Sequence, residues 1–487
     1  MKGNFHILLI ACLLLLAACK HEPSPQVPGT PVADNYPEAV KNIIVNKCAT
    51  AGCHNEASYT GAGGLRLDSR QYLFDGGNNG AVVVPYNTDN SSLLYFINTF
   101  PELGPTAQPT MPYNLPSLSR EDYETLRNWI QSGAPDKAGN IPFHTEAASR
   151  QKIYTVQQGC DLVGVIDAEK SVVMRYISVG KTHDREQPNN ITISPDGCYA
   201  YASFWNAPLI QKIDTRTDSV IAEVATPRAF QKAIQLNEDG TRLIACNWYT
   251  QDLLLIDAVN MNIISNMGQA IRFIGGFAAA PGNVFYATSQ FGNTVYKIQP
   301  DGNHSTISID NKAPVQETAA GTPDPYRIIM SPDKSTYFVT CTHTEEVRMM
   351  NSATDQLIKT IPVGNNPQEM AISTSEPYLF VSCMNDTISA LEVGSVYVIN
   401  YNTGDIVKKI TGKFFQPYAM AADDKNGTLY IFSRNEDRNG PPPHHSGPCS
   451  GRNGFYQVYN IHTLTPINGK RYEISVDPYG AAARFSF

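Results

Sequence analysis

The stretch ITISPDGCYAYASFWNAPLIQKID (residues 191–214) contains three short apolar segments separated by turn-forming residues. The segment ITI precedes the turn SPDG, YAYAS precedes the loop FWNAP, and the third segment ends at Asp214. Short runs of apolar and β-branched residues between Gly, Pro, Asn and Asp are typical of β-strands joined by tight turns. The stretch therefore predicts consecutive strands of one small sheet.

The same pattern recurs along most of the chain. The strand that ends at Asp214 is one of seven similar segments: VGVID (163–167), IQKID (210–214), LLLID (253–257), VYKIQ (295–299), VRMMN (347–351), VYVIN (396–400) and YQVYN (456–460). The starts of successive segments are 47, 43, 42, 52, 49 and 60 residues apart. Each unit adds a second strand, an apolar third strand and a last strand, such as QLIKTIPVG (356–364), IIMSPDK (328–334) and YFVTC (337–341). Seven units with four strands each predict a seven-bladed β-propeller over residues 151–487.

The two ends of this repeat region are out of phase. KIYTV (152–156) reads as a last strand without a unit before it, and DPYGAAARFSF (477–487) reads as a third strand without a last strand after it. We expect the first to complete the blade of the second, so that the ring closes and no sheet edge stays open. The repeats resemble YVTN or YncE-like propellers of bacterial surface and periplasmic proteins, a resemblance of architecture that indicates little about activity.

The N-terminus predicts export. MKGNFHILLIACLLLLAAC (1–19) has one Lys followed by an apolar run at 7–18, which is short for a spanning helix and typical of a signal peptide. Its last four residues, LAAC, resemble a bacterial lipoprotein cleavage box, which implies removal of residues 1–18 and a lipid on Cys19; a plain signal peptide is the alternative. The Pro-rich residues 19–35 indicate a tether. We expect a lipid-anchored protein of a bacterial cell envelope, on the periplasmic or the outer side.

Two helical patterns bracket a Gly-rich middle in residues 36–135, which a polar linker, 136–150, joins to the propeller. Apolar residues have helical spacing in YPEAVKNIIVNKC (36–48). At the other end, Ser119 and Asp122 have the spacing of a capping box, and Gly133 and Pro135 are helix-stop signals. The predicted fold is thus a small all-α domain followed by an all-β propeller.

The segment NKCATAGCHNEAS (46–58) carries two cysteines and a histidine directly after the second. The usual attachment motif for c-type haem is C-x-x-C-H, whereas four residues separate Cys48 from Cys53 here. Covalent haem needs two thiols, an imidazole beside one of them for iron, and a sixth ligand from elsewhere. Met111, the only Met between residues 2 and 173, offers a thioether, which favours reduced iron and raises the potential.

Residues 36–135 resemble class I cytochrome c domains of large exported proteins from environmental bacteria. The segments that carry the resemblance are GGLRLDS (63–69), VVVPYNTDNSSLLYFI (82–97), Met111-Pro112 and NWIQSGAP (128–135). The resemblance implies one covalent haem c with thioethers at Cys48 and Cys53, His54 as the proximal ligand, Met111 as the distal ligand and Trp129 near the macrocycle. Two alternatives are a Cys48–Cys53 disulfide and a zinc site.

The loop after each predicted last strand falls on one face of the propeller. These loops hold Trp205, Trp248, Tyr249 and His343. Aromatic side chains around the propeller axis indicate a candidate face for a small-molecule or protein ligand. Packing between blades is the alternative explanation.

One insertion, RNEDRNGPPPHHSGPCSGRNGFY (434–456), lengthens the last repeat to 60 residues. Long irregular loops are often functional. Its His444, His445 and Cys449 predict either a metal site or a rigid loop that covers the propeller or meets the helical domain.

A net charge of −8 with no basic run argues against nucleic-acid binding.

The main prediction is a lipoprotein that exchanges single electrons with a redox partner protein, while the propeller binds a partner or ligand. No catalytic constellation stands out, which favours an electron-transfer protein over an enzyme. One alternative is a redox enzyme with an active site on the propeller axis, to which the haem supplies electrons. His183, His343, His444 and His445 are the residues to test as cofactor ligands of that site. Another is a non-redox surface-binding protein with a Cys48–Cys53 disulfide.

Overall fold

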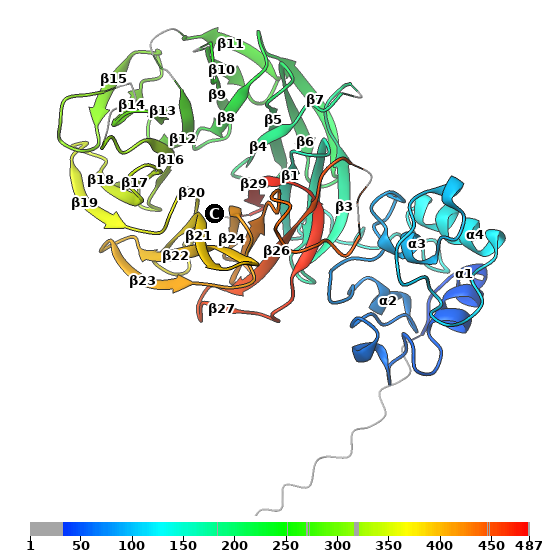
Figure 1. Cartoon of the computed structure of the whole chain (residues 1–487). Helices are drawn as coiled ribbons and strands as arrows, with labels where there is room; N and C mark the ends of the chain where they lie inside the picture. Colours follow the sequence, from blue (N-terminus) through cyan, green and yellow to red (C-terminus); the bar gives the residue numbers. More distant parts are fainter. Residues whose placement is uncertain are drawn as a thin grey trace, which may run out of the picture.

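The computed structural model describes residues 33–485, except 183, 251, 269–270, 272, 316–320, 446 and 448. The chain has a small helical N-terminal part and a seven-bladed β-propeller, which lie side by side in Figure 1. The predicted fold class is therefore confirmed. The predicted signal peptide, Cys19, most of the tether and His183 lie outside the described residues. Within the described residues, no helix has the length and apolar character needed to cross a membrane.

Seven short helices, some of them π or 3-10, build the N-terminal part: α1 (Glu38–Ile43), η1 (Ile44–Cys48), η2 (Tyr59–Gly61), α2 (Arg70–Leu73), α3 (Ser92–Ile97), η3 (Pro101–Leu103) and α4 (Arg120–Gln131). The predicted capping box of α4 is present, because the Ser119 side chain accepts from the Asp122 N–H and the Asp122 carboxylate accepts from the Ser119 N–H. The buried face of α4, which includes Leu126 and Ile130, packs with Val40 and Ile44 of the first helices in one hydrophobic core.

The propeller consists of seven antiparallel sheets. From the innermost strand outward, the blades are β29 (Pro478–Ala483), β1 (Lys152–Gln157), β2 (Leu162–Asp167), β3 (Val172–Ser178); β4 (Pro188–Ile193), β5 (Tyr199–Phe204), β6 (Leu209–Asp214), β7 (Ser219–Ala225); β8 (Gln231–Leu236), β9 (Arg242–Asn247), β10 (Leu253–Asp257), β11 (Asn262–Asn266); β12 (Ile274–Ala280), β13 (Val284–Ser289), β14 (Thr294–Ile298), β15 (His304–Ser308). The remaining blades are β16 (Pro325–Met330), β17 (Thr336–Cys341), β18 (Glu346–Asn351), β19 (Leu357–Pro362); β20 (Pro367–Ile372), β21 (Tyr378–Ser389), β22 (Glu392–Asn400), β23 (Asp405–Ile410); β24 (Pro417–Asp423), β25 (Thr428–Ser433), β26 (Asn453–Asn460), β27 (Thr465–Pro466), with β28 (Tyr472–Val476) also paired to β26.

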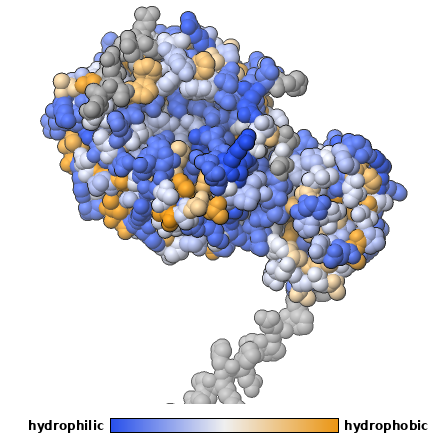
Figure 2. Space-filling model, viewed as in Figure 1, coloured by the Kyte–Doolittle hydropathy of each residue, from blue (hydrophilic) through white to orange (hydrophobic). Residues whose placement is uncertain are grey.

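The ring closes as predicted. β1 pairs with β29, with Ile153 opposite Ala483, so the first strand of the repeat region joins a blade with the last. The third strand of each predicted repeat is the innermost strand of a blade, and the predicted last strand lies second from the axis. The sequence unit therefore spans two neighbouring blades. The face seen in Figure 2 is mostly hydrophilic around the axis, and its hydrophobic residues lie mainly toward the outer edge.

Candidate haem site

The four residues between Cys48 and Cys53 form a compact turn directly after η1. The His54 N–H donates to the Cys48 carbonyl at 3.1 Å, and the Cys53 N–H donates to the Thr50 carbonyl at 3.0 Å. Gly52 has a φ of +81°, a left-handed conformation that glycine adopts without strain. The longer spacer thus folds back on itself and keeps both cysteines and the histidine at one end of the helical pair α1–η1.

His54 is held in one orientation by its own domain. Its Nδ1 atom lies 3.0 Å from the Leu65 carbonyl oxygen, and its own carbonyl accepts from the Leu67 N–H at 2.7 Å. A hydrogen bond at Nδ1 places the proton there and leaves Nε2 available as a metal ligand. Burial lowers the pKa of His54, which favours the neutral imidazole that metals bind. Both features suit a histidine that binds a metal.

Met111 comes from the loop before α4 and belongs to the same site. Its N–H donates to the Phe96 carbonyl at 2.7 Å, which ties the loop to α3. Cys48, Cys53, His54 and Met111 all line one cavity of about 590 Å³. That volume lies in the range of about 300–1,000 Å³ that is usual for small-molecule and cofactor sites. The aliphatic and aromatic side chains around the four residues include Leu65, Leu67, Val82, Val84, Leu93, Phe96 and Ile97.

The donor set fits a haem attached through two thioethers. Cys48 and Cys53 are both free thiols in the structure and are not bonded to each other. Burial, with a smaller effect of Cys53, raises the pKa of the Cys48 thiol to about 11. Trp129 is not among the residues that line the cavity. It packs edge-on against Tyr36 at 6.1 Å in the core, and its indole N–H donates to the Pro135 carbonyl, so the expectation that it lies near the macrocycle is not supported.

The propeller supplies part of the wall of the same cavity. His444 and His445, in the insertion between β25 and β26, line it together with Glu473 of β28 and Tyr176 of β3. The His444 ring lies 4.7 Å from the Phe96 ring, and the His445 ring lies 5.4 Å from the Tyr95 ring. The insertion therefore meets the helical domain, which was one of its two predicted roles.

The other predicted role, a metal site made of His444, His445 and Cys449, does not fit the structure. Cys449 forms a disulfide with Cys160, so its sulfur is not available as a thiolate ligand. The Nδ1 atom of His445 lies 3.1 Å from Glu473 Oε2, at ion-pair distance but without the geometry of a hydrogen bond. Among the described residues, no three His, Cys, Asp or Glu side chains gather as metal ligands.

Loss of the Cys160–Cys449 disulfide is expected to loosen the insertion and to destabilise the propeller. The bond joins positions 289 residues apart, and closing so long a loop restricts the unfolded chain strongly. A Cys160→Ser, Cys449→Ser variant should lose about 2–5 kcal/mol of stability, measured by chemical unfolding against the oxidised protein. As a control, adding reductant to the unmodified protein breaks the same disulfide without a substitution and should lower its stability similarly. Equal stability with and without the bond would contradict the expectation.

Three of the other predicted propeller residues lie together in one aromatic group. Trp205, Trp248 and Tyr249 pack against one another, with ring centroids between 4.7 and 6.1 Å apart. Three further rings join this aromatic group, those of Phe230, Phe273 and Phe291. Tyr249 is 54% exposed, so the group reaches the surface. His343 lies after β17, where its N–H donates to the Pro323 carbonyl.

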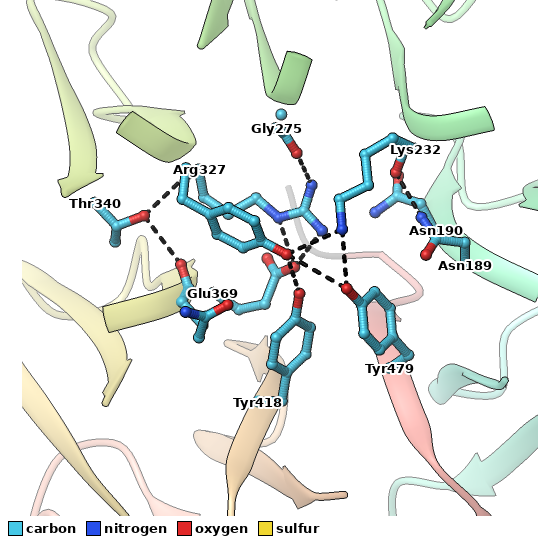
Figure 3. A network of polar contacts seen from close by, with 12 residues as sticks. Asn189, Asn190, Lys232, Gly275, Arg327, Thr340, Glu369, Tyr418 and Tyr479 are labelled. Atoms are coloured by element: carbon cyan, nitrogen blue, oxygen red, sulfur yellow. Dashed lines mark hydrogen bonds and ion pairs between the residues drawn. The ribbon is translucent and has the colours of Figure 1, made fainter. Parts of the chain in front are cut away.

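The propeller axis carries a polar cluster that no sequence expectation included. Its members, shown in Figure 3, include Lys232, Arg327, Tyr418 and Tyr479, and they come from the first residues of the innermost strands. A repeated signal marks these positions, because Pro begins five of the seven innermost strands and Tyr follows it in three, as in DPYRI, QPYAM and DPYGA.

The comparisons with known proteins agree with the two-part fold. The family model "Planctomycete cytochrome C" matches residues 51–102, a segment that includes Cys53 and His54 but neither Cys48 nor Met111. A protein of unknown function from Desulfotomaculum acetoxidans is 15% identical, with a TM-score of 0.50 over 68% of this chain and 100% of that one. No curated protein matches the chain.

Two enzymes are among the other similar solved structures. Kuenenia stuttgartiensis hydrazine synthase is 17% identical, with a TM-score of 0.48 over 63% of this chain and 93% of that one. The dihydro-heme d1 dehydrogenase NirN is 13% identical, with a TM-score of 0.47 over 85% of this chain and 95% of that one. At such low identity, similarity to solved structures concerns the fold alone. The chain thus combines an N-terminal region similar to Planctomycete cytochrome c domains with a seven-bladed β-propeller.

Proposed function

We propose that this chain is an exported c-type cytochrome that holds one haem c covalently and passes single electrons to and from a redox partner protein. The observation that carries the proposal is that Cys48, Cys53 and His54 of one segment and Met111 of another line one cavity. In this proposal Cys48 and Cys53 would attach the haem, and His54 and Met111 would bind its iron. The bound haem supplies a one-electron redox centre.

The chain's own residues set the properties of that centre. The Leu65 carbonyl fixes the orientation of His54, and the Phe96 carbonyl fixes the backbone of Met111. Hydrogen bonds of this kind to ligand residues tune a metal site and keep its geometry constant between oxidation states. The apolar lining excludes water, and together with a thioether ligand this favours the reduced state and raises the potential.

Electron exchange needs an edge of the cavity that a partner can approach. Lys47 and Tyr113 of the helical domain line the cavity, and Tyr113 is 62% exposed. His444 and His445 of the propeller also line the cavity. We infer that the redox partner docks beside Tyr113, while the propeller shields the remainder of the site from water.

A spectrum tests this proposal directly. The full chain, produced together with a cytochrome maturation system, should show the reduced-minus-oxidised bands of a low-spin c-type haem. The haem should stay on the polypeptide after denaturation. A folded protein that carries no covalent haem under these conditions would exclude electron transfer through this site.

Replacing His444 with Ala is expected to lower the haem potential. The His444 ring packs on Phe96, whose carbonyl holds Met111, so its removal opens the cavity to water on the Met111 side. Water stabilises the more highly charged oxidised state. Potentiometric titration of the two proteins measures the effect. His343→Ala, which changes a histidine away from the cavity, is the control and should leave the potential unchanged; an equal shift in both variants would refute the role of His444.

The proposal also includes a location for the protein, which rests on the sequence of its N-terminus. We infer that Cys19 becomes the lipid-bearing N-terminus and that the tether places the haem domain near a membrane of the cell envelope. Palmitate labelling of cells that express the chain, compared with a Cys19→Ala variant, should give label only on the unmodified protein. Label on both proteins, or on neither, would contradict the anchor.

A further inference from the structure

Every blade repeats one backbone device at the start of its innermost strand. The residue just before that strand has a positive φ, between 52° and 67°, in all seven blades: Gln187, Phe230, Phe273, Asp324, Asn366, Gln416 and Asp477. The pairing register then shifts directly after the first strand residue, so the next residue has no partner in the ladder. Bulges of this type re-aim a side chain and are frequent beside active sites. Here they turn one residue per blade toward the axis.

The residues at this position form a ring, which we call the axial ring: Asn189, Lys232, Gly275, Tyr326, Gln368, Tyr418 and Tyr479. The polar contacts of the ring meet at the Tyr326 hydroxyl, which is hydrogen-bonded to Lys232, Tyr418 and Tyr479 (Figure 3). Its ammonium donates to the Tyr326 hydroxyl at 3.1 Å and to the Tyr479 hydroxyl at 2.9 Å. The hydroxyls of Tyr326 and Tyr418 are hydrogen-bonded to each other. One ammonium and three phenols therefore meet on the axis.

The buried charges around this ring do not balance. Arg327 pairs with Glu369 through Nε at 2.6 Å, and Arg434 pairs with Asp477 at 2.6 and 2.9 Å. Lys232, which is 7% exposed, contacts no carboxylate in the part of the chain that the structure describes. Burial lowers the pKa of Lys232, but the Tyr326 and Tyr479 oxygens outweigh this effect and raise it. Two phenol oxygens thus take the place that a carboxylate holds beside Arg327 and Arg434, and a buried ammonium without a carboxylate partner is unfavourable.

We propose that the axial ring is a binding site for a small oxyanion, a carboxylate or an inorganic oxyanion, with Lys232 as its counterion. Besides its two contacts to tyrosine, the Lys232 ammonium has a third hydrogen to donate. The Tyr479 hydroxyl accepts from Lys232 and lies 3.4 Å from the Tyr326 hydroxyl, so its hydrogen can point either to Tyr326 or to the anion. The Tyr326 hydroxyl accepts from Lys232 and is also hydrogen-bonded to Tyr418. Charge-assisted hydrogen bonds of this kind are the strong ones in anion recognition.

Apolar walls would enclose this anion. The Trp205 ring lies 5.7 Å from the Lys232 ammonium, and the same ring belongs to the aromatic group that reaches the surface at Tyr249. A few converging polar groups beneath an aromatic wall are the usual composition of a small-molecule site. The loop residues that the sequence indicated therefore acquire a role as the wall of the axial site.

The insertion at 434–456 joins this site to the haem cavity. Arg434 begins it and lies over the rings of Tyr479 at 4.7 Å and Tyr418 at 5.3 Å. Ten residues later, His444 lines the haem cavity. One segment, fixed by a disulfide, thus contacts both sites. The anion site itself does not depend on haem loading and can be tested separately from the proposed electron transfer.

Calorimetric titration of the full chain with acetate, inorganic phosphate and sulfate tests the proposal. At least one of these anions should bind saturably with one site per chain; acetate represents the carboxylates, and phosphate and sulfate the inorganic oxyanions. Lys232→Met should weaken binding by about 10-fold or more, the usual effect of losing a hydrogen bond to a charged group. Lys212→Met is the matched control, since Lys212 on β6 is also buried but donates to the Ala258 carbonyl in the turn after β10, and it should bind as the unmodified protein does.

Tyrosine titration supplies a second readout. Burial raises the pKa of the Tyr479 phenol, but Lys232 and Arg434 outweigh it and lower the pKa to about 8. A bound anion offsets these cations, so the binding anion should move the phenolate absorbance transition to higher pH. Tyr479→Phe keeps the aromatic ring and should remove this phenolate transition and weaken anion binding several-fold. This variant tests the anion site if Lys232→Met fails to fold. Absence of saturable binding by all three anions, or unchanged affinity in Tyr479→Phe and Lys232→Met, would overturn the proposal.

Discussion

A variant in which Cys48 and Cys53 are both replaced with Ser is expected to lose covalent haem completely. A thioether forms from a cysteine sulfur, and a serine hydroxyl at the same place cannot form it. Both thiols line the cavity that holds His54 and Met111, and the structure leaves both unbonded. Haem staining after denaturing electrophoresis, together with the mass of the intact chain, measures the loss.

The matched control is Cys198→Ser, which changes another partly buried free cysteine, one that lies outside the cavity near the Asp196 carbonyl. It should keep a full complement of haem. The single variants Cys48→Ser and Cys53→Ser should each retain one attachment point and show less covalent haem than the unmodified chain. Full staining of the double variant would contradict thioether attachment at these residues, and equal loss in Cys198→Ser would indicate a general effect on folding.

The parts of the fold that were predictable from sequence depend on local chemistry. Turn residues after each strand, the capping box at Ser119 and the incomplete repeats at both ends act over a few residues each, and the structure contains all of them. The grouping of Cys48, Cys53, His54 and Met111 was accessible for a related reason, because the attachment motif itself places three of the four side by side.

The features that sequence reasoning missed depend on contacts between distant segments. The bond between Cys160 and Cys449 joins residues 289 apart, and no spacing rule connects them. A meeting of the insertion with the helical domain was one of two predicted roles, but the contact of His444 with Phe96 depends on how the two domains pack and was not predicted. The axial ring was not predicted because each blade contributes one residue and the residue types differ. These residues share only the positive φ of the residue before the strand and the β-bulge after its first residue.

The aromatic loops illustrate how a correct observation led to an incomplete interpretation. Trp205 and Trp248 do lie at equivalent positions, each directly after the second strand of its blade, and with Tyr249 they pack across neighbouring blades. The Trp205 ring also lies 5.7 Å from the ammonium of Lys232, which is on an innermost strand. Packing and ligand binding are therefore not exclusive alternatives for these residues, since the same rings fill the blade junction and cover the axial charge.

Replacing Met111 with Ala is expected to lower the haem potential strongly while leaving the haem attached. A thioether ligand stabilises reduced iron, and the choice of axial ligands changes the redox potential of haem proteins over a range of roughly 0.8 V. Because the Phe96 carbonyl binds the backbone N–H of residue 111, the loop should keep its place in the variant. Redox titration and the near-infrared ligand band of the oxidised protein measure the change.

Met174→Leu is the matched control for this experiment. Met174 lies on β3 next to Val173, which lines the cavity, but it is buried in the propeller core and does not line the cavity itself. Its replacement should leave both the potential and the ligand band unchanged, because no contact with the proposed iron position is lost. A potential that stays constant in Met111→Ala would mean that another side chain is the distal ligand. His444 is then the residue to replace next, since its ring lies on Phe96, the residue that anchors Met111.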